Sequence, residues 1–176
     1  QRALLQKKGV QRFPRDREVI DSLKTKDVYN IKTKNRVYFL ERLENYENRE
    51  FVQIEGNSAI TIEHIFPQNP DPKWKITLGE EEYNFIKDNF LNTIANLTLS
   101  GNNGKLGNKP FLFKRDLQDA GYKDSRLWLN KYLASVEEWN KSSIEARFNL
   151  ICDRFVKIWE FPDIDFDLES VEDEVN

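Results

Sequence analysis

The sequence predicts a mainly α-helical α+β fold, in which a small strand–strand–helix unit lies between helical segments. Apolar residues recur at helical spacing near both ends of the chain, and they alternate with polar residues over residues 59–67. A loop rich in glycine and asparagine follows at residues 100–108. Since 176 residues can bury one sizeable core, we expect one domain over residues 1–159.

The first helical segment covers about residues 1–50 and is basic, with 13 Lys and Arg against 8 Asp and Glu. The stretch from Asp16 to Leu23 has its acidic residues early, which favours the positive end of a helix dipole. Apolar residues recur at near-helical spacing from Arg36 to Leu43. We expect this segment to serve as scaffold.

The predicted strand–strand–helix unit covers about residues 58–118. Its first strand alternates, with Ile60, Ile62 and His64 on one side and Glu63 on the other. Adjacent side chains on a strand leave on opposite faces, so Glu63 and His64 are expected to point in different directions.

Between the strands, two prolines in residues 68–75 predict a loop, and an acidic first turn predicts a helix over residues 80–91. A second strand is expected over residues 96–99, followed by a turn-rich loop over residues 100–108. Pro110 suits the first turn of the helix that completes the unit.

The second helical segment is expected over residues 120–159. Ser125 is a candidate cap, while Ser135 and Ser142 each precede a glutamate at capping-box spacing. Five apolar residues lie on one helical stripe that we expect to be buried: Ile144, Phe148, Ile151, Phe155 and Ile158.

The net charge of −3 is unevenly distributed, because residues 160–176 hold eight acidic residues and no Lys or Arg. Residues 1–159 therefore carry +5, which leaves basic surface for a polyanion, and the acidic end is expected to be a flexible tail. No apolar run reaches the roughly 20 residues of a membrane span and no signal peptide is visible, so we expect a cytoplasmic protein. The chain contains no methionine, so we expect it to be the C-terminal piece of a longer protein.

His64 is the only histidine of the chain. Imidazole titrates near neutral pH and suits a general base, while carboxylate and carboxamide oxygens suit Mg²⁺. Hydrolysis of a phosphodiester needs such a base and such a cation. Taken alone, however, a histidine beside Glu63 on an alternating strand is more often a structural residue.

Three segments of the chain form a recognisable set: IEHIFPQ, ANLTLSGNNGKLGNKPFLFKR and WNKSSIEARFNLICDRFVKIW. Together they resemble the C-terminal domain of the GmrSD-type restriction endonucleases, a branch of the HNH or histidine–metal finger nucleases. The likeness extends from about Val19 to Trp159. The resemblance implies a ββα-metal (HNH-like) finger embedded between the helical segments. It also implies an N-terminal nucleotide-hydrolysing domain in the full-length protein.

The resemblance assigns roles to residues that match the family pattern. His64 matches the general base, and Glu63 matches the acidic metal ligand before it. Asn96 matches the middle asparagine, which orients the ribbon and the base. The third position is a metal ligand, and counting back from the Asn-Lys-Pro-Phe element assigns it to Asn103. The expected cofactor is Mg²⁺ or Mn²⁺.

The Asn-rich loop leaves alternatives for the third position, since Asn102 or Asn108 could take that role. Asn102, Asn103 and Gly104 could instead form an ordinary turn. Three basic residues match positions expected to contact the DNA backbone. They are Lys109, Lys114 and Arg115, which could equally form a solvated helix face.

We therefore expect a metal-dependent DNA endonuclease that cleaves or nicks DNA as the effector domain of a prokaryotic restriction or anti-phage defence protein. Two alternatives stay open. The first is a catalytically inactive DNA-binding or inter-domain regulatory module, and the second is a nuclease directed at RNA. The motif does not distinguish DNA from RNA, and it carries no code for a target sequence or modification.

Overall fold

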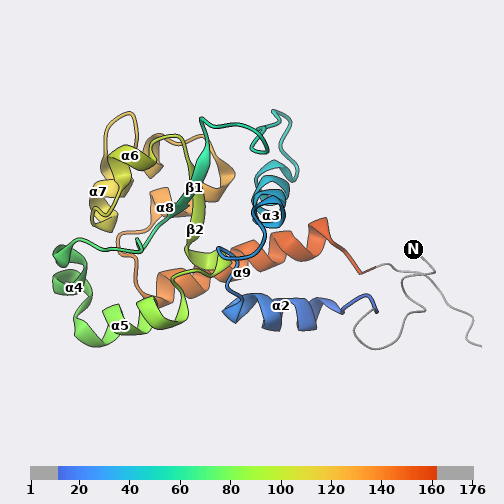
Figure 1. Ribbon diagram of the computed structural model, residues 1–176, viewed down its shortest axis with the longest axis horizontal. Coiled ribbons are helices and arrows are strands. Elements are labelled where there is room, and N and C mark those ends of the chain that lie inside the picture. Colours follow the sequence, from blue (N-terminus) through green and yellow to red (C-terminus); the bar gives the residue numbers. More distant parts are fainter. Residues whose placement is uncertain (1–11, 162–176) are drawn as a thin grey trace, which may run out of the picture.

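A short two-stranded antiparallel ribbon lies near the middle of a mainly helical molecule, as the computed structural model shows for residues 12–161 (Figure 1). The predicted α+β, mainly helical fold is confirmed. The helices before and after the ribbon, and between its strands, are α2 (Asp16–Thr25), α3 (Thr33–Asn45), α4 (Pro72–Leu78), α5 (Glu80–Asn89), α6 (Asn103–Leu106), α7 (Phe111–Asp116), α8 (Trp128–Ser135) and α9 (Lys141–Ile158).

The ribbon pairs β1 (Thr61–His64) with β2 (Leu97–Ser100). In its register Glu63 lies opposite Thr98, and His64 lies opposite Leu97. Directly opposed residues of an antiparallel pair share a face of the sheet. Glu63 and His64 therefore face opposite sides of the ribbon, as the alternating pattern predicts.

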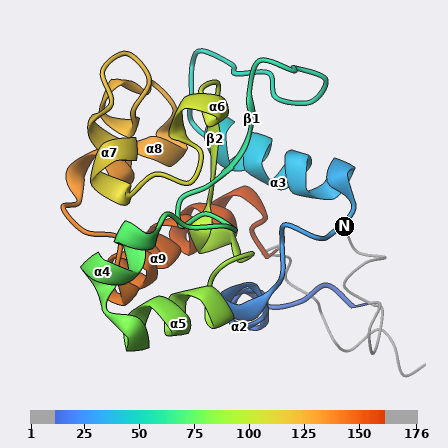
Figure 2. The same ribbon diagram turned by 60° about the vertical axis from the view of Figure 1, so that its left-hand side comes forward.

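Different elements cover the two faces of the ribbon. Helices α6 and α7 lie on one side and α3 lies on the other (Figures 1 and 2). Side chains of α6 and α7 reach β1 through Asn103 and Lys114. The face of His64 instead meets Tyr29, from the loop between α2 and α3. The two residues of the Glu-His pair thus lie in separate environments.

The prediction of a loop over residues 68–75 is wrong for its second half, because helix α4 begins at Pro72. Asp71 accepts a hydrogen bond from the backbone N–H of Lys73 at 2.9 Å, which caps the helix. Pro72 occupies the first helical position, where its missing N–H costs nothing. The prolines here start a helix rather than prevent one.

The C-terminal segment is helical as expected, but its three predicted caps are wrong. Helix α9 is capped by Asn140, whose side chain accepts from the backbone N–H of Ser143 at 2.9 Å, and not by Ser142. Ser135 ends α8 rather than starting a helix. Ser125 lies two residues before the cap position of α8, and its hydroxyl accepts from the backbone N–H of Leu127 at 3.3 Å.

The predicted apolar stripe of α9 packs into the hydrophobic core. Ile144, Phe148, Ile151 and Phe155 are buried, and Ile158 packs against them. Helix α9 also contacts the short 3-10 helix η2 (Ile94–Asn96) that leads into β2. The ribbon is therefore anchored to the core at the start of its second strand.

The described residues contain no helix long and apolar enough to cross a membrane. The predicted acidic tail lies almost wholly beyond residue 161 and therefore outside the described residues. Residues 1–11, where the first helical segment was expected to start, also lie outside the described residues.

Candidate active site

The His64 side chain is almost buried, with 8% of its surface exposed. Its Nε2 lies 3.2 Å from Oδ1 of Asn92, at the end of the segment between the strands. The ring of Tyr29 stands edge-on to the imidazole, with 4.4 Å between ring centroids. The guanidinium carbon of Arg36 lies over the same tyrosine ring, 4.7 Å from its centroid. The imidazole of His64 therefore lies between the side-chain amide of Asn92 and the ring of Tyr29.

The electrostatic surroundings lower the pKa of the His64 imidazole and so favour its neutral form. Burial lowers the pKa of His64, and the charges of Lys114 and Arg36 lower it further, against the opposing effect of Asn92 and Asp27. Nδ1 makes no hydrogen bond within the described residues and is not among their buried unpaired atoms. The lowered pKa favours the neutral imidazole, which has one free lone pair and is the form that can accept a proton.

Glu63 lies on the other face of β1, where it forms a buried ion pair. Nζ of Lys114 donates to its Oε1 at 2.6 Å and to the backbone carbonyl of His64 at 2.8 Å. The Lys114 side chain has no exposed surface and that of Glu63 is 8% exposed. Burial raises the pKa of Glu63, and Lys114 opposes that effect. A cation therefore already sits against the carboxylate that the sequence assigns to a metal.

Asn103, the first residue of α6, is fixed against the start of β1. Its Nδ2 donates to the hydroxyl of Thr61 at 2.7 Å and to the carbonyl of Ile62 at 2.9 Å. Its Oδ1 is buried and has no hydrogen-bond partner among the described residues. Because an unpaired buried acceptor is costly, this oxygen fits a ligand for a cation.

The two other loop asparagines lie differently. Asn102 precedes α6, and its carbonyl accepts from the backbone N–H of Lys105 at 2.8 Å. Asn108 is exposed, and its carbonyl accepts from the backbone N–H of Asp71 at 3.0 Å. Neither has a buried unpaired side-chain oxygen in the described part of the chain. Of the three, Asn103 has the geometry that best suits a metal ligand.

Within residues 12–161, no three side chains of His, Cys, Asp or Glu gather where they could hold a metal ion. Glu63 and Asn103 supply one carboxylate and one carboxamide. Mg²⁺ retains several waters and is often bound by one or two carboxylates, so such a small donor set is chemically consistent with it.

Asn96 joins the end of β1 to the start of β2. Its Nδ2 donates to the carbonyls of Phe66 and Leu91, both at 2.9 Å, and its Oδ1 accepts from the backbone N–H of Phe66 at 2.8 Å. Nε1 of Trp139 donates to the same oxygen at 3.1 Å. This fully buried amide orients the ribbon, but none of its hydrogen bonds goes to His64.

The ribbon and the helices that flank it lie within the part of the sequence that matches a known protein family. The model of the GmrSD restriction endonucleases, C-terminal domain, matches residues 13–154 of the 176. The chain belongs to this family. No curated protein is similar enough to the chain to count as a match. Membership in the GmrSD family associates the chain with restriction endonucleases.

The prediction that Lys114 and Arg115 lie on an exposed face of this GmrSD domain is wrong. Lys114 is bound to Glu63, and Arg115 is 5% exposed. Arg115 pairs with Asp116 at 2.8 Å and with Glu137 at 2.7 Å. Both cations neutralise carboxylates of their own chain, which leaves neither one exposed for a phosphate.

Lys109 remains exposed, and its Nζ lies 5.9 Å from the ring centroid of Phe113. The carbonyl of Lys109 accepts from Nε1 of Trp74 at 3.0 Å, which ties this loop of the GmrSD domain to α4. Of the three basic residues predicted to contact DNA, Lys109 alone is exposed.

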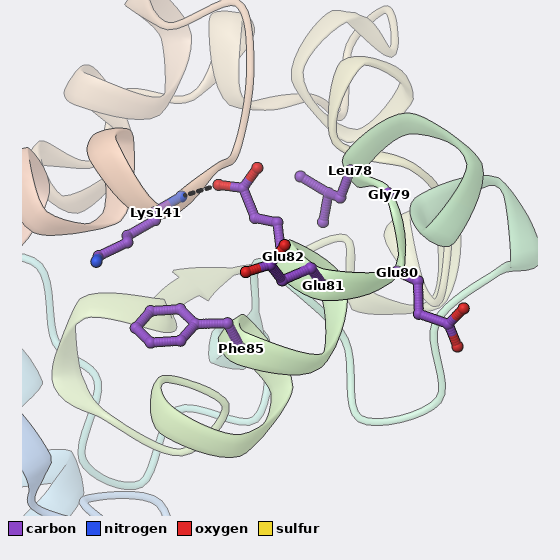
Figure 3. Close-up of a pocket in the computed structure, with 7 residues that line it drawn as sticks. All are labelled: Leu78, Gly79, Glu80, Glu81, Glu82, Phe85 and Lys141. Atoms are coloured by element: carbon purple, nitrogen blue, oxygen red, sulfur yellow. Dashed lines mark hydrogen bonds between the residues drawn. The ribbon is translucent and has the colours of Figure 1, made fainter.

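A hollow of about 630 Å³ on the GmrSD domain is lined by none of the predicted site residues. It lies between the α4–α5 junction and the start of α9 (Figure 3). Three consecutive glutamates, Glu80, Glu81 and Glu82, line it, and Glu82 accepts from the backbone N–H of Lys141 at 2.8 Å. An acidic wall repels phosphate, so this hollow does not suit a nuclease substrate.

Sequence reasoning missed the residues that surround the imidazole in the GmrSD domain. Asp27, Tyr29 and Arg36 come from the N-terminal segment that was expected to be only scaffold, and Asn92 comes from the turn after α5. The one available signal was the basic composition of residues 1–50. Tyr29 and Asn92 contact the imidazole directly, and both lie tens of residues from His64 in the sequence, so no local pattern reveals them.

Proposed function

We propose that this chain is a Mg²⁺-dependent, HNH-type DNA endonuclease domain with His64 as its general base. The observation that carries the proposal is the imidazole at the end of β1, whose Nε2 meets Asn92 while its Nδ1 makes no hydrogen bond within the described residues. Family membership supports DNA as the substrate class, since restriction endonucleases cut DNA. We further propose that the domain acts in prokaryotic defence against foreign DNA.

In the proposed reaction, Nδ1 of His64 takes a proton from a water molecule. The water oxygen forms a bond to phosphorus, the bond from phosphorus to the 3′ oxygen breaks, and that oxygen receives a proton from solvent. Glu63 and Asn103 would hold Mg²⁺, which when bound neutralises charge on the phosphate and the leaving oxygen. Asn96 keeps the strand that carries His64 and Glu63 in register. Lys109 would contact the DNA backbone.

Replacing His64 by alanine is expected to lower the rate of plasmid nicking by at least about a hundredfold, because a positioned general base contributes about that much or more. The assay follows conversion of supercoiled to open-circular and linear DNA in Mg²⁺, in Mn²⁺ and in EDTA. A matched single-stranded RNA in the same buffers tests the alternative substrate. Equal nicking by the wild type and His64→Ala would remove His64 from the mechanism.

Replacing Asn103 by alanine is expected to abolish most of the stabilisation that Mg²⁺ gives the folded domain, since a ligand stabilises the state that binds it. The measurement is the change in Tm between EDTA and millimolar Mg²⁺. The matched controls are Asn102→Ala and Asn108→Ala, which should keep the wild-type response. A loss confined to either control would transfer the ligand role to that asparagine.

One observation favours a second candidate function, a DNA-binding module without turnover. Lys114 already neutralises Glu63, and an ion pair that persists in the presence of Mg²⁺ would leave no carboxylate for the metal. This candidate predicts salt-sensitive DNA binding without any cleaved product in Mg²⁺ or Mn²⁺. Nicking that depends on both a divalent ion and His64 would exclude it.

A further inference from the structure

Asn92 joins the strand of His64 to the loop between α2 and α3. Its side chain meets Nε2 of His64 at 3.2 Å, and its Nδ2 lies 3.4 Å from Oδ2 of Asp27. Its backbone carbonyl accepts from the N–H groups of Val28 and Tyr29 at 2.9 Å and 3.1 Å. Asn92 is thus fixed from both its backbone and its side chain.

The contact with Asp27 decides which way the Asn92 amide points. A carboxylate only accepts hydrogen bonds, so it takes the NH₂ end of the amide and leaves the oxygen directed at the imidazole. Asp27 is itself held by Asn30, whose backbone N–H and Nδ2 donate to its two oxygens at 2.9 Å and 2.8 Å. The amide oxygen therefore faces His64 because its other end is occupied.

An amide oxygen beside Nε2 requires that nitrogen to carry the proton. In a neutral imidazole one nitrogen is a donor and the other an acceptor, so a proton on Nε2 leaves the lone pair on Nδ1. The edge-on ring of Tyr29 limits rotation of the imidazole. The contacts that link Asp27 to Asn92 and Asn92 to His64 thus specify both the tautomer of the imidazole and the direction of its free lone pair.

We propose that Asn92, oriented by Asp27, is the positioning residue that holds His64 in the Nε2–H form and directs Nδ1 at the substrate water. Sequence reasoning gave the orientation of the base to Asn96, but the hydrogen bonds of that amide go to Phe66, Leu91 and Trp139. The consequence for catalysis rests on the proposed function; the tautomer does not.

The single histidine makes the tautomer directly observable. Long-range ¹H–¹⁵N spectra of the ¹⁵N-labelled chain in EDTA, above the pH at which imidazole is protonated, show one spin system. The wild type should show a fully protonated Nε2 and an unprotonated Nδ1. In Asn92→Ala the two ¹⁵N shifts should move toward each other as the Nδ1–H form becomes populated. Asp27→Ala should produce a smaller movement in the same direction, because the freed amide can turn its NH₂ toward the ring.

Asn89→Ala is the matched control, because Asn89 is exposed and its side chain binds only the carbonyl of Phe85 in the described structure. It should leave the His64 spectrum unchanged. The backbone contacts of Asn92 with Val28 and Tyr29 survive the alanine substitution, so Asn92→Ala should still fold. A wild-type spectrum with the proton on Nδ1, or an unchanged spectrum in Asn92→Ala, would overturn the positioning role whatever the nuclease assay shows.

The catalytic part is tested by plasmid nicking. Asn92→Ala should lower kcat by about 10- to 100-fold with little change in KM, the size of effect found when a partner that orients an essential histidine is removed. Asn92→Asp keeps an acceptor at Nε2 but sets a second carboxylate against Asp27, so Asp27→Asn/Asn92→Asp, which restores a donor between the two side chains, should recover part of that loss. If the wild type does not cleave, the proposed function fails while the tautomer result stands. A changed tautomer with unchanged kcat would overturn the link to catalysis.

Discussion

Replacing Asn96 by alanine is expected to lower the free energy of unfolding by at least about 3 kcal/mol, since three buried polar groups lose their partner at about 1–3 kcal/mol each, and a fourth, half-buried group loses its partner as well. Those groups are the N–H and carbonyl of Phe66, the carbonyl of Leu91 and Nε1 of Trp139. No part of the Asn96 side chain is exposed, so water does not replace these bonds.

Urea denaturation followed by tryptophan fluorescence measures this loss. Asn84→Ala is the matched control, because Asn84 is exposed on α5, and its change should stay within about 0.5 kcal/mol. Trp139→Phe offers a milder variant that removes one of the four bonds and folds more readily. A loss below about 1 kcal/mol in Asn96→Ala would mean that the amide does not hold the ribbon.

The ribbon and the opposed directions of Glu63 and His64 could be predicted from sequence, because a strand has a period of two and its pattern is local. The stripe of α9 could be predicted for the same reason, from its helical period. Helix α4 was missed because proline was interpreted as a breaker, although Asp71 before Pro72 is a start signal.

The partners of the site residues could not be predicted in this way. Lys114 lies 51 residues from Glu63, and Asn92 lies 28 residues from His64. In the sequence Lys114 and Arg115 are two charges on a short helix, and such charges are usually solvated. Only the packing of α7 against β1 shows that one of them neutralises a buried carboxylate. The type of residue is visible in the sequence, whereas its partner depends on the fold.

Replacing Lys114 alone by methionine is expected to cost about 3–5 kcal/mol of unfolding free energy, because it leaves the Glu63 carboxylate buried without a cation. The carbonyl of His64 also loses its donor. The double variant Glu63→Gln/Lys114→Met removes both charges and should be clearly more stable than Lys114→Met. Urea denaturation of the wild type, both single variants and the double variant gives the coupling free energy. Additive losses would contradict a buried ion pair.

The loss of unfolding free energy caused by Lys114→Met should become larger as the pH rises. Burial already raises the pKa of Glu63, and loss of Lys114 raises it further because the opposing charge is gone. The folded state then binds more protons than the unfolded state between the ordinary glutamate value of about 4.3 and the raised pKa. Stability of Lys114→Met should therefore fall as pH rises through that window, and the deficit should shrink in acid. A deficit that does not change with pH would contradict this origin.

The same variant tests whether Lys114 and Mg²⁺ compete for Glu63. With Lys114 removed, the Glu63 carboxylate is the buried charge in need of a cation, and Asn103 of α6, which is hydrogen-bonded to the strand of Glu63, offers an unpaired oxygen. Mg²⁺ should then raise the Tm of Lys114→Met by more than it raises that of the wild type, and Glu63→Gln should remove the difference. An equal response in all three proteins would mean that a divalent ion does not bind at Glu63, so that the ion pair, and not a metal, is the permanent state of that carboxylate.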